Sequence, residues 1–181
     1  MIKLGSKIAI KILGYYFLNP DKKHYVNELA GMLEADPGNL FRKLQELQAE
    51  GILVSFKQGN QKYFGLNKKY PLLKEIKKTY NVKYGLTGRL KEIASRIKNL
   101  KEAYIFGSYA KNSLQQESDI DILLIGGHSA LEAKRKILPL QNEIKREINI
   151  IDLTPKEFNL RKRRKDEFIK NIFSNKIIKL L

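Results

Sequence analysis

Two aspartates one residue apart open an apolar run, and a glycine closes an earlier apolar run of similar kind. The first run, Tyr104–Phe106, stops at Gly107, and the second run, Ile122–Ile125, follows Asp119 and Asp121. Such runs predict two buried strands, and glycine permits a sharp turn and a close backbone approach at the end of the first. Because side chains two apart on a strand share a face, both carboxylates are expected to project together.

The pair of carboxylates favours a metal site. Two like charges this close are costly beside an apolar strand unless a cation lies between them. Mg²⁺ accepts one or two carboxylates and completes its shell with water and substrate phosphates, and Mn²⁺ is the alternative ion. Ser108 lies where a helix can begin, with a hydroxyl and N–H groups suited to phosphate oxygens. The pattern predicts the parts needed for phosphoryl or nucleotidyl transfer.

These residues also resemble a known signature. Gly107-Ser108, Ala110-Lys111 and Ser118-Asp119-Ile120-Asp121 are similar to the G-S-x-A-(R/K)-G…S-D-x-D pattern of the DNA polymerase β-type nucleotidyltransferases, in particular their minimal branch. The resemblance implies a nucleoside triphosphate (NTP) substrate and catalytic, metal-binding roles for Asp119 and Asp121. It also implies phosphate contacts from Gly107, Ser108, Ser118 and, more weakly, Lys111.

The chain departs from that pattern at two places. Asn112 stands where the family usually has glycine, and asparagine is the residue that best tolerates a left-handed backbone there. Active members carry a third acidic residue on a later strand, and the matching strand here, 147–153, places Asn149 at that position as a metal ligand. Asp152 falls on the other face by alternation, although a register slip or bulge would bring it in as the catalytic carboxylate. With Asn149, nucleotide and metal binding can persist while catalysis is weak or absent, so enzyme activity stays open.

The first third of the chain has a separate pattern. Helical periodicity covers about 8–17, 25–33 and 39–50, and two short strands, 52–56 and 61–66, follow as a hairpin. This order, with Glu28-Leu29-Ala30 and Leu44-x-x-Leu47-x-x-x-Gly51-Ile52-Leu53, resembles the winged helix-turn-helix of ArsR-like and MarR-like regulators.

In that fold the third helix enters the major groove of DNA and the wing touches the backbone or minor groove. The side chains predicted to contact DNA lie off the apolar stripe of the third helix and along the wing: Asn39, Arg42, Lys43, Lys57, Gln58, Asn60 and Lys62. The alternative is a winged helix used only for dimerisation or protein contact.

Together these patterns predict an α+β chain. A winged helix-turn-helix domain is expected at 1–68, a connector helix at 69–84, and a small nucleotidyltransferase α/β domain at 85–181, with a mixed sheet and a C-terminal helix. Helices are predicted at about 86–100 and 129–146, with a strand at 103–106. The amphipathic C-terminal segment is expected to cover the sheet or to form a dimer seam.

Charge favours a polyanionic partner. The chain has 35 Lys+Arg against 19 Asp+Glu, a formal +16, and both 1–80 and 81–181 are basic. The cluster Arg161–Lys165 is either a solvated helix face or a contact for DNA, RNA or an acidic protein. His24 and His128 are isolated in the sequence and are predicted to be surface residues.

Other classes of protein are disfavoured by composition. The chain has no cysteine, which excludes a disulfide framework and a thiolate metal site. No apolar run approaches the length of a membrane span and no signal peptide is visible, so a cytoplasmic protein without a membrane partner is expected.

Three functions therefore compete. The chain is predicted to be a DNA-binding protein with a nucleotidyltransferase domain that transfers a nucleotidyl group to a hydroxyl. The alternatives are a transcriptional regulator whose impaired transferase domain senses nucleotide, and an antitoxin-type partner protein. A homodimer is expected by analogy with paired half-sites.

Overall fold

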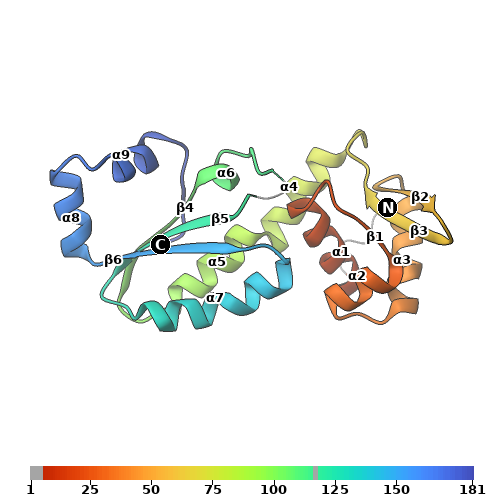
Figure 1. The fold of residues 1–181 in the computed structure, drawn as a ribbon, viewed down its shortest axis with the longest axis horizontal. Helices are drawn as coiled ribbons and strands as arrows, with labels where there is room; N and C mark the ends of the chain where they lie inside the picture. Colours follow the sequence, from red (N-terminus) through yellow and green to blue (C-terminus); the bar gives the residue numbers. More distant parts are fainter. Residues whose placement is uncertain (1–5, 116–117) are drawn as a thin grey trace. The chain divides into compact units, whose positions relative to one another are not determined.

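The computed structural model describes residues 6–115 and 118–181. Residues 1–5 of the predicted first domain lie outside the described part of the chain. The chain divides into two compact units, Met1–Gly85 and Leu86–Leu181, and each is drawn in Figure 1 with its own set of helices and strands.

The first unit combines helices with a small antiparallel sheet of order β1-β3-β2. Its elements are α1 (Lys7–Leu18), β1 (Lys23–Tyr25), α2 (Val26–Leu33), α3 (Pro37–Ala49), β2 (Leu53–Gln58), β3 (Gln61–Leu66) and α4 (Leu73–Tyr84). Helix α3 begins at Pro37, two residues before the expected start at about 39, because Asp36 caps it by accepting a hydrogen bond from the Asn39 amide at 2.8 Å and Pro37 fits the first turn.

One hydrophobic core holds this unit together. The apolar stripes of α1, α2 and α3 pack on the inner face of the sheet, and the buried residues include Ile12, Leu13, Tyr16, Leu29, Leu40, Leu44, Ile52 and Phe64. Helix α4 joins the same core through Ile76 and Tyr80, and the Tyr80 hydroxyl donates a hydrogen bond to the Ile10 carbonyl at 3.1 Å. The segment expected to act as a connector therefore carries a helix that packs within the first unit.

The second unit is built on a four-stranded sheet of order β6-β5-β4-β7. Its elements are α5 (Leu86–Ser95), β4 (Leu100–Phe106), α6 (Gly107–Ala110), β5 (Ile120–Gly126), α7 (Ala130–Ile144), β6 (Ile148–Leu153), α8 (Pro155–Arg163), α9 (Glu167–Ser174) and β7 (Ile178–Lys179). Strands β5 and β6 are parallel, while β4 is antiparallel to both β5 and β7. The mixed sheet expected from the sequence is confirmed.

Helices cover both faces of this sheet. Helices α5 and α7 run along one face (Figure 1). On the other face, Leu123 and Ile125 of β5 are buried against Ile169 and Ile172 of α9, with Phe158 of α8 packed at the side. The amphipathic C-terminal segment thus covers the sheet, and alternation places Asp121 on this same α8–α9 face because it lies two residues before Leu123.

Two details differ from the sequence analysis. The helix expected to reach residue 100 ends at Ser95, and β4 begins at Leu100 after Asn99 adopts a left-handed φ of 63°. His24, predicted at the surface, is only 8% exposed, because the Tyr15 hydroxyl lies 2.7 Å from its Nε2 atom. The partners of a buried histidine are set by packing, which a single sequence does not display.

Among residues 6–115 and 118–181, no helix has the length and hydropathy needed to cross a membrane.

Candidate active site

The pairing of three strands brings a carboxylate and an amide together. In β5, Asp121 lies opposite Phe106 of the antiparallel β4 and opposite Asn149 of the parallel β6. The Asn149 side-chain amide donates a hydrogen bond to the Asp121 carboxylate, with 3.3 Å between Nδ2 and Oδ1. Asn149 is therefore the residue of β6 that stands beside the aspartate pair.

Asp119 and Asp121 act on each other electrostatically. Asp119 is exposed just before β5 begins, and Asp121 is partly buried. Burial raises the pKa of the Asp121 carboxyl above its ordinary value, the hydrogen bond from Asn149 opposes this, and the charge of Asp119 raises the pKa further. A cation bound between two such carboxylates would offset the repulsion between their negative charges.

Gly107 is required where β4 ends. Its φ is +72°, in the left-handed region, and a Cβ atom placed there would lie 2.2 Å from the Asp121 Oδ2 atom. No other residue permits both this backbone angle and this approach. The backbone of the turn is thus packed directly against the carboxylate.

The turn continues through the short helix α6. Ser108 lies in its first turn and is partly exposed, while Lys111 is exposed just after it. Asn112 adopts a left-handed φ of 57°, so the prediction that asparagine substitutes for glycine there is confirmed. Tyr109 makes a side-chain hydrogen bond with Thr87 of α5, which anchors α6 to the rest of the unit.

Arg146, a residue not predicted from the sequence, holds the segment that precedes the aspartates. This side chain is 7% exposed, and its guanidinium donates hydrogen bonds to the Gln115 carbonyl at 3.0 Å and to the Ser118 carbonyl. The Ser118 hydroxyl accepts from the Gln115 amide at 3.1 Å, so the structure uses this hydroxyl within the loop itself. Arg146 lies two residues before buried Ile148, so alternation indicated its face but not its distant partners.

Asp152 lies elsewhere. It is opposite Leu124 of β5, and alternation along β6 turns it to the face opposite Asn149. Its Oδ1 atom is 2.7 Å from Nε2 of His128, whose side chain is only 2% exposed. The structure therefore does not bring Asp152 to the aspartate pair. The prediction that His128 is a surface residue is wrong, because its side chain is buried against Asp152, which is distant in the sequence.

Asp119, Asp121 and Asn149 are the side chains that could hold a divalent cation. Asp119, Asp121 and the amide oxygen of Asn149 are oxygen donors of the kind that Mg²⁺ takes. Within the described part of the chain, no cluster of three or more His, Cys, Asp or Glu side chains is placed to hold a metal. The donor set is thus two carboxylates and an amide, to which a bound triphosphate would add its own oxygens.

The predicted DNA-binding residues lie at two exposed places in the first unit. On α3, Asn39 and Arg42 are exposed and bonded to each other, and Lys43 pairs with Glu46. At the β2–β3 turn, Lys57, Gln58 and Asn60 are exposed, and the Lys62 ammonium lies 5.1 Å from the centre of the Phe64 ring.

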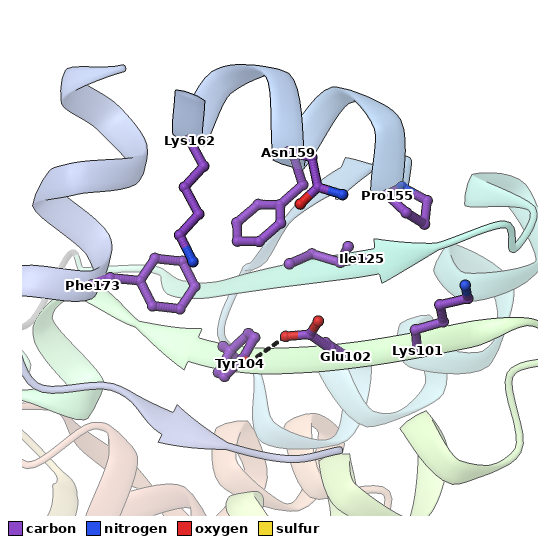
Figure 2. Close-up of a pocket in the computed structure, with 9 residues that line it drawn as sticks. Lys101, Glu102, Tyr104, Ile125, Pro155, Asn159, Lys162 and Phe173 are labelled. Carbon is purple, nitrogen blue, oxygen red and sulfur yellow. Dashed lines mark hydrogen bonds between the residues drawn. The ribbon is translucent and has the colours of Figure 1, made fainter. Parts of the chain in front are cut away.

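A separate pocket of about 280 Å³ opens beside α8 in the second unit. Figure 2 shows Glu102 bonded to Tyr104 on its floor, with Lys101 and Lys162 at opposite sides. Buried Leu123 and the side chains around it lie along the sheet between this pocket and Asp121. The basic cluster Arg161–Lys165 is exposed, and α8 has no buried residue.

Comparisons with known proteins bear on the second unit. The family model described as polymerase beta, nucleotidyltransferase matches residues 89–179, half of the chain. No curated protein matches the chain.

Three solved structures are similar to part of it. One is a toxin–antitoxin with AMP-PNP, 17% identical, covering 53% of this chain and 73% of its own, with a TM-score of 0.39. A mutant of the toxin–antitoxin MntA–HpeT is 15% identical, covering 52% and 72%, with a TM-score of 0.39. A candidate nucleotidyltransferase from Sulfolobus solfataricus is 28% identical, covering 43% and 68%, with a TM-score of 0.28.

Proposed function

Because the chain belongs to the polymerase beta nucleotidyltransferase family through residues 89–179, we propose that its second unit binds an NTP with a divalent cation and transfers a nucleotidyl group. The observation that carries the proposal is the placement of Asp121 of β5 between Gly107, directly after β4, and Asn149 of the adjoining strand β6. This domain is proposed to occupy about 85–181, and the acceptor is a hydroxyl group.

Each residue of the site has a proposed role. Asp119 and Asp121 hold the cation, Gly107 and Ser108 lie against the phosphates, and exposed Lys111 adds positive charge. When bound, Mg²⁺ or Mn²⁺ neutralises phosphate charge and helps to orient the reacting groups. Arg146 positions the loop that carries Ser118 and Asp119 by holding its backbone carbonyls.

Asn149 limits the reaction. Its amide can offer an oxygen to the cation, but it can neither accept the proton of an attacking hydroxyl nor neutralise positive charge. The site is therefore proposed to bind nucleotide normally and to transfer slowly, since a positioned general base contributes roughly 10²- to 10⁴-fold.

The test restores the missing carboxylate. Purified protein is incubated with a radiolabelled NTP, Mg²⁺ and nucleic acids bearing a free 3′-hydroxyl, and released pyrophosphate is measured. Asn149→Asp should accelerate transfer, and Asp121→Asn should abolish both transfer and cation binding by calorimetry. Asp152→Asn is the matched control and should leave NTP and cation binding unchanged, because that carboxylate faces His128.

Two results would contradict this assignment. Loss of NTP binding in Asp152→Asn, with no effect of Asn149→Asp, would place the third carboxylate at 152 through a shifted register. Normal cation binding in Asp121→Asn would remove the proposed metal site.

The first unit supports a second function, duplex DNA binding by a winged helix-turn-helix. The order α1–β1–α2–α3–β2–β3 supports it, and so do the exposed Asn39 and Arg42 on α3 and the exposed Lys57 at the hairpin. If Asn149 leaves the second unit unable to catalyse transfer, the protein is proposed to be a regulator in which nucleotide binding accompanies DNA binding.

Arg42→Ala tests the DNA role. If Arg42 reads a base edge, the change should weaken specific duplex binding by about 1–3 kcal/mol. Arg89→Ala is the control, because this exposed arginine of α5 pairs with Glu143 in the second unit. If Arg42→Ala binds duplex DNA as tightly as Arg89→Ala and the unmodified protein do, a role for α3 in DNA binding is contradicted. An RNA or acidic-protein partner at Arg161–Lys165, an antitoxin-type role and a homodimer remain predictions.

A further inference from the structure

The small sheet of the first unit has one face that packs on helices and one that does not. In the row formed by His24, Phe64 and Ser55, Phe64 is completely buried against the core. The residues one position along each strand point the other way. On that outer face Val54 is 43% exposed and Phe56 is 38% exposed.

Three aromatic rings lie in one row across this outer face. Tyr25 of β1 is paired with Tyr63 of β3, which is paired with Phe56 of β2. The Phe56 and Tyr63 rings are stacked, with 5.5 Å between their centroids and 19° between their planes. The Tyr25 ring meets Tyr63 edge-on at 5.7 Å. Because Phe56 stands on the edge strand and remains exposed, a planar group can continue the stack outward.

A lysine lies beside the rings. Gly65 occupies the next position on the outer face, and the Lys23 side chain passes over it, with its Cγ atom 3.1 Å from where a Gly65 Cβ would be. Lys23 thereby reaches across β3 to place its ammonium 4.8 Å from the centre of the Phe56 ring. A side chain at position 65 would crowd this path and require the Lys23 side chain to shift by a few tenths of an ångström.

The charge of the sheet is of one sign. The three strands and the β2–β3 turn contain Lys23, Lys57 and Lys62 and no aspartate or glutamate. Lys57 and Lys62 alternate to the inner face, so Lys23 is the lysine of these strands that lies on the outer face. Exposed rings would also suit an apolar protein surface, but Lys23 beside Phe56 and the glutamines 58 and 61 on the same face suit a ligand with flat rings and phosphates.

We propose that the outer face of the β1–β3–β2 sheet is a stacking platform for single-stranded nucleic acid. A base stacks on the exposed ring of Phe56, which Tyr63 supports from behind, and Lys23 pairs with the phosphate of the stacked nucleotide. This surface is distinct from the predicted duplex contacts on α3, and it does not depend on nucleotidyl transfer in the second unit.

The experiment measures binding of the full-length protein by fluorescence anisotropy, without NTP or metal. The probes are a labelled single strand of about 12 nucleotides, an abasic strand with the same number of phosphates, and a duplex of the same sequence. The unmodified protein should bind the normal strand at least roughly tenfold more tightly than the abasic strand, since stacking on a ring is worth about that much per base. This comparison needs no variant and so does not depend on any variant folding.

The variants Phe56→Leu and Tyr63→Leu keep apolar bulk but remove a ring. Each should weaken single-strand binding roughly fivefold to a hundredfold with an unchanged salt dependence, whereas Lys23→Gln should reduce the salt slope. Phe168→Leu is the matched control, because Phe168 is similarly exposed, at 37%, but lies on α9 in the second unit.

Three outcomes would overturn the proposal. Equal affinity for normal and abasic strands would leave only phosphate binding. If Phe56→Leu and Tyr63→Leu weaken duplex and single-strand binding equally, the outer face contacts duplex and is not specific for single strands. Sedimentation showing a dimer that Phe56→Leu dissociates would assign the face to a second copy of the chain. None of these results would alter the expected transfer activity, which is measured separately with the Asn149 variants.

Discussion

Gly107 is the residue whose identity the site tolerates least. Gly107→Ala should lower the free energy of unfolding by at least about 1–2 kcal/mol, the cost of a left-handed angle for a residue with a Cβ. It should also weaken cation binding, because the added methyl displaces the Asp121 carboxylate. Urea unfolding and calorimetry with Mn²⁺ measure the two effects.

Gly31 supplies the control for that change. It lies within α2, and a Cβ there meets nothing within 4 Å. Gly31→Ala should therefore stabilise the protein by roughly 0.5–1 kcal/mol. If Gly107→Ala and Gly31→Ala lower the free energy of unfolding equally, the left-handed backbone angle of Gly107 does not make alanine costly there.

Arg146 is expected to matter through the loop it holds. Arg146→Leu leaves the Gln115 and Ser118 carbonyls without this donor, which should cost about 1.5–3 kcal/mol. Cation affinity should fall as well, because Asp119 follows Ser118 directly. Arg135→Leu, at an exposed position of α7, should change stability by no more than about 0.5 kcal/mol. An Arg146 variant with normal cation affinity would reduce this residue to a structural role.

For single residues, backbone preferences could be predicted from the sequence, whereas contacts with residues far away in the chain could not. The left-handed Asn112 follows from the conformational range of asparagine. The choice between Asn149 and Asp152 stayed open, because a one-residue shift of β6 would exchange its two faces. Burial of His128 and Arg146 escaped notice, since their partners lie 24 to 31 residues away in the chain.

Among the elements, α8 has a capped first turn and packs on the sheet through partly buried Phe158. It has no buried residue, and a capping box closes its start: the Thr154 hydroxyl accepts from the Glu157 amide, and Glu157 accepts from the Thr154 amide at 2.8 Å. The hydrogen bonds from Thr154 hold the pKa of the Glu157 carboxyl below its usual range.

This geometry predicts fraying of α8 in acid. A carboxyl whose pKa is lower in the folded state stabilises fully above its unfolded pKa, and that stabilisation is lost as the pH falls through the folded value. Hydrogen exchange of α8 amides should therefore quicken more below about pH 4 than ordinary acid dependence allows. Thr154→Ala should expose the amides already at neutral pH and remove the extra acid sensitivity. An α8 that is equally protected in both proteins would contradict this.

The elements themselves followed from periodicity, except for the shortest. The sequence pattern indicated α1, α2, α3 and the β2–β3 hairpin, since each has an apolar stripe and a turn signal. Strands β1 and β7 escaped prediction because segments of three and two residues carry no period. They form only because β3 and β4 offer free edges to pair with.

For the whole molecule, two cores predict two unfolding events. Met1–Gly85 and Leu86–Leu181 form separate compact units, and the proposed nucleotide site lies within the second. Calorimetry should resolve two unfolding transitions. NTP with Mn²⁺, at a hundredfold excess over Kd, should increase the free energy of unfolding of the second unit alone, by about 2.7 kcal/mol. Single-stranded nucleic acid should stabilise the first unit. A single transition that both ligands shift together would show that the units unfold as one.

The last residues of the described chain cover the edge of strand β4. Strand β7 pairs with β4, and the Leu180 amide donates to the Ala103 carbonyl at 2.8 Å, which covers one side of the sheet. Proteolytic trimming of these last residues would leave β4 with a row of unsatisfied amides and carbonyls. That row is a template for strand addition between molecules, so clipped protein is expected to precipitate before it loses its helices.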